Sequence, residues 1–242
     1  MKKVMPLVIA ISLTACGGGD GTSTNLLRID ADNAEALARN IYNAFDAFGN
    51  IDSILLGVDI PENGQTEYPC DQGDIVITAN LGLDNIPNEA GEYIDAEFNN
   101  CVDESTSETF NGNVKLTLDS WASEDNQSIS LDFDLDYTFD NFRDSGSGSF
   151  DITILGSSVE LTANMDYTSG ELGGMVKIST GTPIRYEIND FYPSTGDITA
   201  TGAEGSYLTL DADTGDIDTV YYYVTDGASY VDSDVIDWIA LD

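Results

Sequence analysis

Apolar and polar residues alternate along most of the chain beyond residue 49. The alternation is clearest over residues 132–140, where Phe133, Leu135, Tyr137 and Phe139 are separated by aspartates and one threonine. A period of two places all the apolar side chains on one face of an extended strand and all the acidic or hydroxyl side chains on the other. The pattern therefore predicts a strand with one buried and one solvated face.

The same period recurs often enough to predict a sheet of about 10–12 strands. The segments are 75–81, 94–98, 114–118, 132–140, 150–154, 159–167, 176–178, 184–188, 197–202, 206–211, 219–225 and 235–240. Turn signals such as Asn111-Gly112 and Thr214-Gly215 separate them, and connections this short join antiparallel neighbours. The predicted fold is mainly β: a long antiparallel meander, either an open curled sheet or a closed barrel-like one.

A helical period precedes the strands. Asp32 is a helix-capping residue type, Glu35 follows three positions later, and apolar residues recur at helical spacing: Leu37, Ile41, Ala44 or Phe45, and Phe48. This predicts one amphipathic N-terminal helix over 33–48, packed on the sheet. A membrane-surface or partner-binding helix is the alternative, but the basic polar face typical of interfacial helices is missing.

The first residues are typical of an export signal. Lys2 and Lys3 precede an apolar run over 4–13, which is too short to span a bilayer. Leu13-Thr14-Ala15-Cys16 resembles the lipobox of bacterial lipoproteins, which implies that Cys16 carries acyl chains such as palmitate and begins the mature chain. In that family an aspartate after the cysteine favours inner-membrane retention, so Gly17 implies the outer membrane. The alternative is an ordinary signal peptide with a chance cysteine.

These features predict three parts: a signal peptide over 1–15, the lipidated Cys16 with a flexible linker over 16–30, and a single β-rich domain over 31–242. The linker assignment rests on the composition of GGGDGTST, residues 17–24.

Charge and composition narrow the classes of function that the chain can have. The chain has 44 acidic and 8 basic residues, a net charge of −36, which repels nucleic acid and anionic lipid headgroups. The absence of histidine excludes the usual Ser-His-Asp, Cys-His and zinc sites in their standard forms. We therefore expect a protein that is not an enzyme; a histidine-independent hydrolase is the weaker alternative.

Two cysteines remain beyond Cys16. In an oxidising compartment, Cys70 and Cys101 predict a disulfide that closes a loop of about 31 residues and stabilises the fold by roughly 3–4 kcal/mol. A reactive thiol pair is the alternative, but the spacing is not Cys-x-x-Cys.

One acidic turn is a candidate cation site. Asp211, Asp213, Asp216 and Asp218 surround Gly215, and Ca²⁺ prefers such oxygen ligands. The order of glycine and aspartate is inverted relative to the helical calcium loop, and Tyr222 stands where that loop has glutamate. An ordinary Asp- and Gly-rich hairpin turn is the alternative; no other cofactor is predicted.

Aromatic residues near the C-terminus are a second candidate. Tyr221 and Tyr223 share one strand face, and Trp238 follows closely. Such rings can stack on sugars or line an apolar cavity. Ordinary packing within the sheet is the alternative.

Several loose motifs accompany the lipobox: Asn33-Ala34, Cys70-Asp71-Gln72-Gly73, Asn100-Cys101, Asn111-Gly112, residues 193–196 and residues 238–241. Together they resemble a group of Gram-negative lipoproteins of unknown activity, so the resemblance implies location and not chemistry.

The predicted function is that of a non-catalytic binding or structural protein of the cell envelope, anchored in the outer membrane and facing either the periplasm or the outside. We expect it to hold a hydrophobic ligand on the concave face of the sheet, or to contact an envelope protein or polysaccharide. A calcium-binding surface or adhesion component is the alternative.

Overall fold

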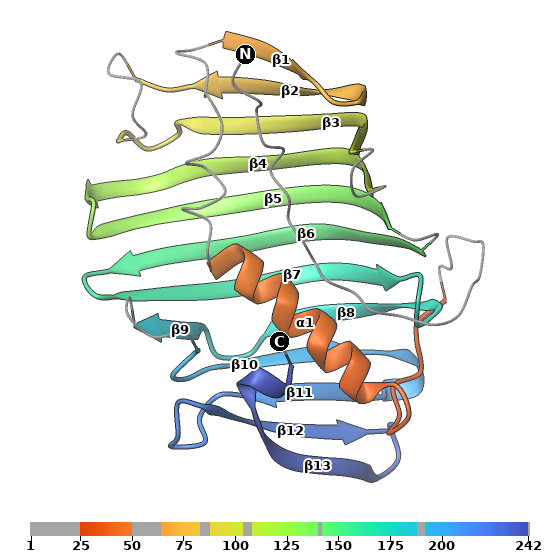
Figure 1. Cartoon of the computed structure of the whole chain (residues 1–242). Coiled ribbons are helices and arrows are strands. Elements are labelled where there is room, and N and C mark those ends of the chain that lie inside the picture. Colours follow the sequence, from red (N-terminus) through yellow and green to blue (C-terminus); the bar gives the residue numbers. More distant parts are fainter. Residues whose placement is uncertain are drawn as a thin grey trace.

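A computed structural model describes residues 25–49, 64–82, 88–103, 108–139, 142–187 and 192–241. One antiparallel sheet of 13 strands and one α-helix make up this part of the chain (Figure 1). The predicted fold class, a long antiparallel meander with a single N-terminal helix, is confirmed. The sheet is open, with β1 and β13 as its two edges, so the closed alternative is not adopted.

The elements follow one another closely along the chain. They are α1 (Ala34–Gly49), β1 (Gly64–Pro69), β2 (Gln72–Asn80), β3 (Tyr93–Asp103), β4 (Glu108–Ser123), β5 (Asn126–Phe139), β6 (Phe142–Leu155), β7 (Ser158–Ser169), β8 (Gly174–Thr180), β9 (Ile184–Glu187), β10 (Asp197–Thr201), η1 (Ala203–Gly205), β11 (Tyr207–Asp211), β12 (Thr219–Thr225), β13 (Tyr230–Asp237) and η2 (Trp238–Ala240).

Strands that follow one another in sequence pair with one another except around β9. Strand β7 is longer than β8, so its residues 164–169 pair with β8 while its residues 158–161 pair with β9. Strand β10 then continues the sheet along β8, where Ile198 lies opposite Thr180. The meander is thus interrupted once, and the sheet order resumes from β8 to β10.

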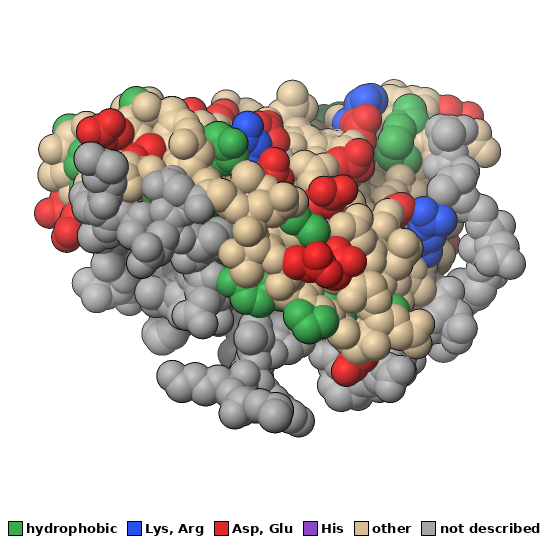
Figure 2. All heavy atoms as spheres, turned by 90° about the horizontal axis from the view of Figure 1, so that it is seen from above, with side chains coloured by type: hydrophobic (Ala, Val, Ile, Leu, Met, Phe, Trp, Pro, Cys, Tyr) green, Lys and Arg blue, Asp and Glu red, His purple; other side chains and the backbone are tan. Residues whose placement is uncertain are grey.

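The two faces of the sheet differ as the alternation predicts. On β5, Leu131 and Phe133 are buried while Asp132 and Asp134 are exposed. We call the face that carries Phe133 and the helix the inner face, and the opposite face the outer face. Acidic side chains are spread over the surface seen from the β1 side, with few basic ones among them (Figure 2).

Helix α1 lies against the inner face and forms the main core with it (Figure 1). Its residues Leu37, Ala38 and Ile41 are almost fully buried among inner-face side chains of β5 to β12. Asn33, rather than Asp32, organises the start of the helix. Its backbone oxygen accepts from the N–H of Leu37 at 3.0 Å, and its side-chain oxygen accepts from the N–H of Asp30 at 3.1 Å.

Two segments depart from the predicted strands. Strand β1 was not predicted, because Tyr68 is the one large apolar side chain of its sequence GQTEYP. The predicted strand over 235–240 is instead the end of β13 followed by the short helix η2. The strand ends there because Trp238 turns into the core, where its ring lies 5.3 Å from that of Tyr42.

The predicted signal peptide, Cys16 and residues 17–24 lie outside the described residues, so lipidation remains a prediction. Leu27, near the end of the predicted linker, is already part of the folded body. Its N–H donates to the backbone oxygen of Met175 at 2.7 Å, and its own oxygen accepts from the N–H of Ala203 at 2.7 Å. Within the described ranges, no helix has the length and apolar character needed to cross a membrane.

Candidate functional site

A hollow of about 480 Å³ opens on the outer face over β2, β3 and β4. We call it the polar hollow. It is lined by Val76, Thr78, Asp95, Glu97, Phe98, Asn99, Asn111, Gly112 and Asn113.

The strand register explains why these polar side chains converge. Thr78 lies opposite Asp95, and Glu97 lies opposite Asn113 on the next strand. Their neighbours in sequence, such as Ile77 and Ala96, point to the inner face and pack into a small apolar cluster. Three adjacent strands therefore present hydroxyl, carboxylate and amide groups to one space while the opposite face stays apolar.

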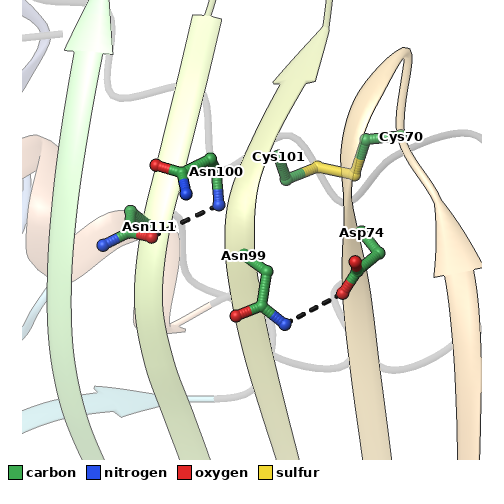
Figure 3. Close-up of a disulfide and its surroundings, with 6 residues drawn as sticks. All are labelled: Cys70, Asp74, Asn99, Asn100, Cys101 and Asn111. Carbon is green, nitrogen blue, oxygen red and sulfur yellow. Dashed lines mark hydrogen bonds between the residues drawn. A yellow bond between two sulfur atoms is a disulfide. The ribbon is translucent and has the colours of Figure 1, made fainter.

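The predicted disulfide between Cys70 and Cys101 is confirmed and lies near Asn99, which marks one end of the lining of the polar hollow (Figure 3). It ties the residue that follows β1 to β3, with 5.4 Å between the two Cα atoms. Beside it, the amide nitrogen of Asn99 donates to Asp74 Oδ1 at 2.9 Å. One side chain of the lining is thereby fixed by the neighbouring strand.

A β-bulge shapes the same end. The β3–β4 register shifts between Phe98 and Cys101, and Asn100 has a left-handed backbone with φ of 48°. Asparagine tolerates this conformation better than most residues. The N–H of Asn100 donates to Asn111 Oδ1 at 3.2 Å, which joins the bulge to β4 (Figure 3).

Two glycines allow the backbones to approach closely here. Gly73 has φ of +73°, and a Cβ on it would collide with the backbone oxygen of Asn99. Gly112 has φ of +120°, and a Cβ there would collide with the backbone oxygen of Asp134. The motifs at 70–73, 100–101 and 111–112, which stand apart in the sequence, thus meet at one place, although the sequence did not single out Asp95, Glu97 or Asn113.

The lining favours ligands that are rich in hydroxyl or N–H groups. Carboxylates accept hydrogen bonds, while amide and hydroxyl groups both donate and accept. Lys115, which lies opposite Asp95, places its ammonium nitrogen 4.6 Å from the centre of the Tyr93 ring. The two carboxylates in the wall, Asp95 and Glu97, disfavour an anionic ligand. An apolar ligand is also disfavoured, because the lining offers few apolar atoms.

The acidic turn at 211–218 uses carboxylates within its own backbone. Asp211 Oδ1 accepts from the N–H of Asp213 at 2.9 Å, and Asp216 Oδ1 accepts from the N–H of Asp218 at 3.2 Å. These bonds are typical of Asx turns. Among the residues that the structure describes, no group of three or more His, Cys, Asp or Glu is arranged to hold a metal ion. Calcium binding at this turn stays a prediction.

The aromatic candidates separate. Tyr221 and Tyr223 lie on the outer face, on the alternate positions of β12 that are not buried. Trp238 is 1% exposed and belongs to the inner core, between the rings of Tyr42 and Tyr192. The sequence did not indicate that α1 covers the Trp238 ring, because that contact depends on how the helix packs on the sheet.

A buried carboxylate lies on the inner face, where the alternation of β6 puts Asp144. Its Oδ1 accepts from the N–H of Gly170 at 2.7 Å and its Oδ2 from the hydroxyl of Tyr167 at 2.9 Å. Burial raises the pKa of Asp144, although both hydrogen bonds act against the shift. The Tyr167 pKa is raised as well, by burial first and then by the carboxylate. With an N–H or O–H donor on each of its oxygens, the carboxylate has a structural role.

Searches against protein-family models, curated proteins and solved structures each gave no match to this chain.

Proposed function

We propose that this chain is a non-catalytic binding protein of the cell envelope, anchored to the outer membrane through Cys16, which binds a saccharide in the polar hollow. The observation that carries the proposal is that three separate motifs meet beside one hollow, which the motif Asn111-Gly112 lines. These motifs supply the disulfide, the bulge and the close backbone approach that hold this part of the sheet together. A sheet held this firmly presents its hydrogen-bonding groups in a fixed arrangement, which lowers the entropy cost of binding.

The choice of a saccharide follows from the lining. Sugar hydroxyls donate and accept hydrogen bonds, and they match a wall of amide, hydroxyl and carboxylate groups such as Asn99, Thr78 and Glu97. A hydrophobic ligand on the inner face has weaker support. There, Phe150 and Leu161 are fully buried in the core that α1 forms with β5 to β12.

The anchor has its own test. Expression of the full chain in a Gram-negative host with a clickable palmitate analogue should label the wild type and not a Cys16→Ser variant. The wild type should fractionate with outer membranes, and the variant should not. Labelling of the Cys16→Ser variant to the wild-type level, or no labelling of either, would contradict anchoring through this residue.

Saccharide binding is tested with the full chain in detergent against oligosaccharides of glucose, galactose and N-acetylglucosamine. Asn113→Ala removes one amide from the hollow and should weaken binding about tenfold, the cost of a hydrogen bond of about 1.4 kcal/mol. Ser149→Ala, on the outer face of β6 and outside the hollow, is the matched control and should bind like the wild type. Absence of binding, or equal loss in both variants, would rule the site out.

A further inference from the structure

Four tyrosines gather on the outer face at the opposite end of the sheet from the polar hollow. Tyr207, Tyr221, Tyr223 and Tyr230 come from β11, β12 and β13, and we call them the tyrosine platform. The ring of Tyr223 lies 6.0 Å from Tyr207, 5.7 Å from Tyr221 and 6.3 Å from Tyr230. The hydroxyls of Tyr221 and Tyr230 are hydrogen-bonded at 2.9 Å.

The tyrosine platform is more than packing between strands. Cross-strand aromatic pairs do stabilise sheets, and this accounts for Tyr207 beside Tyr223. Tyr230, however, is 55% exposed on the edge strand, and Val235, opposite Tyr221 in the register, is 53% exposed. The cluster therefore extends as apolar surface to the edge of the sheet, beyond what the core of β12 requires.

Its surroundings are mainly acidic, with Arg28, paired with Glu204, as a basic residue near Asp226 of the β12–β13 turn. No Lys or Arg follows Arg185 in the sequence. Asp211 lies directly opposite Tyr221, and Asp237 lies on the same outer face at the end of β13. Asp232 and Asp234 point to the inner face, where Asp232 accepts from the hydroxyl of Tyr222. This field repels anionic partners and also repels a second copy of the same surface.

The edge strand β13 does not present a free backbone edge for another strand to pair with. The N–H of Val235 donates to the carboxylate of Asp234 at 2.8 Å, and acidic residues on an edge discourage pairing with unrelated strands. Recognition here is therefore better served by side chains on the outer face than by backbone pairing alone.

We propose that the tyrosine platform is a docking surface for a basic segment of a partner protein, whose arginine or lysine side chains lie over the tyrosine rings between the flanking aspartates. Tyrosine faces attract cations, and arginine stacks on them especially well. The carboxylates of Asp211 and Asp237, on the same face as the rings, supply the complementary charge. This surface is independent of the saccharide site.

The test uses the full chain and a synthetic peptide that alternates arginine and threonine, with a glutamate-for-arginine peptide as the negative probe. Tyr230→Leu keeps an apolar side chain but removes the ring, and we expect at least a tenfold weaker affinity for the arginine peptide. Tyr230→Phe keeps the ring and should stay within about twofold of the wild type. Because Tyr230 is exposed, neither change should unfold the chain.

A charge-matched pair separates docking from general attraction. Asp211→Asn lies beside the tyrosine platform, opposite Tyr221, and should weaken arginine-peptide binding several-fold, while Asp132→Asn, on the outer face of β5, should not. The proposal is overturned if Tyr230→Leu binds like the wild type, if both Asp variants lose affinity equally, or if the glutamate peptide binds as well as the arginine peptide.

Discussion

At the scale of single residues, Asp144 is an acidic side chain buried on the apolar inner face of the sheet. Because its folded-state pKa is raised by burial, the folded state binds more protons than the unfolded state between the ordinary and the raised value. The free energy of unfolding therefore falls as pH rises through that window. Asp144→Asn should remove this loss, so the variant gains stability relative to wild type as pH rises from 4 to 7, measured by urea denaturation.

The control for that comparison is Asp132→Asn on the exposed face of the neighbouring strand. Its stability relative to wild type should change little over the same pH range, because solvent surrounds that side chain in the folded chain as it does in the unfolded one. Parallel curves for Asp144→Asn and wild type would show that burial of this carboxylate does not link folding to pH.

The same residues show how far the sequence predicts individual positions. The alternation assigned Phe133 to the core and Asp132 to solvent because the period of two depends on local chain geometry alone. Asp144 also follows that period to the inner face, but its partner Tyr167, and Asn40 that binds Tyr167 in turn, lie far from it along the chain. Tyr167 donates to Asp144, and Asn40 of α1 donates to the Tyr167 hydroxyl at 3.5 Å. Such a network depends on the tertiary fold and has no local signal.

At the scale of elements, the Cys70–Cys101 disulfide holds the β1–β2 edge to β3. Replacing both cysteines with serine should lower the free energy of unfolding by roughly 3–4 kcal/mol, the loop-entropy contribution of a cross-link of this span. Denaturation with and without reductant measures it. Reductant should destabilise the wild type and leave the double variant unchanged. Equal sensitivity of both proteins to reductant would contradict a stabilising role for this disulfide.

Helix α1 stabilises the sheet through its buried stripe. Leu37 is fully buried, so Leu37→Ala should cost about 2–5 kcal/mol through lost burial and a residual cavity. Glu35→Ala on the exposed side removes the 3.3 Å ion pair with Arg39 and should cost about 0.3–0.5 kcal/mol. Thermal or urea unfolding compares the two; equal effects would mean that the helix is not packed as described.

Elements with strong periodicity were predictable, and weakly patterned ones were not. Helix α1 carries many apolar residues at helical spacing, and the long strands β4 to β7 carry many apolar residues at a period of two. Strand β1 has few, and its position at the sheet edge requires little burial, so the sequence gives no clear period there. The pairing of β9 with β7 depends on the relative lengths of β7 and β8. The polar hollow was marked only by its glycine, asparagine and cysteine motifs, because polar outer-face residues resemble any solvated strand.

At the scale of the whole molecule, the balance of 44 acidic against 8 basic residues places most carboxylates without a cationic partner. The ion pairs of the described residues engage five basic side chains: Arg28, Arg39, Arg143, Lys177 and Arg185.

Repulsion among the remaining acidic side chains opposes the compact state. Salt screens this repulsion, because the Debye length falls from about 30 Å at 0.01 M to about 10 Å at 0.1 M. Raising NaCl across this range should therefore raise the melting temperature, by about 2–4 °C for each kcal/mol of repulsion screened. An unchanged or lower melting temperature would contradict net repulsion in the folded state.

The same measurement separates screening from specific calcium binding at the turn that contains Asp211 and Asp216. At matched ionic strength, non-specific screening gives CaCl₂ and NaCl similar effects, whereas a calcium site adds stability that grows with the logarithm of free calcium. Because these two carboxylates accept hydrogen bonds from their own turn, we expect the two salts to differ by less than about 1 °C at 1 mM calcium. An extra rise with calcium that chelator reverses and that Asp216→Asn abolishes would contradict this expectation. It would establish the calcium-binding alternative, with the turn as its site.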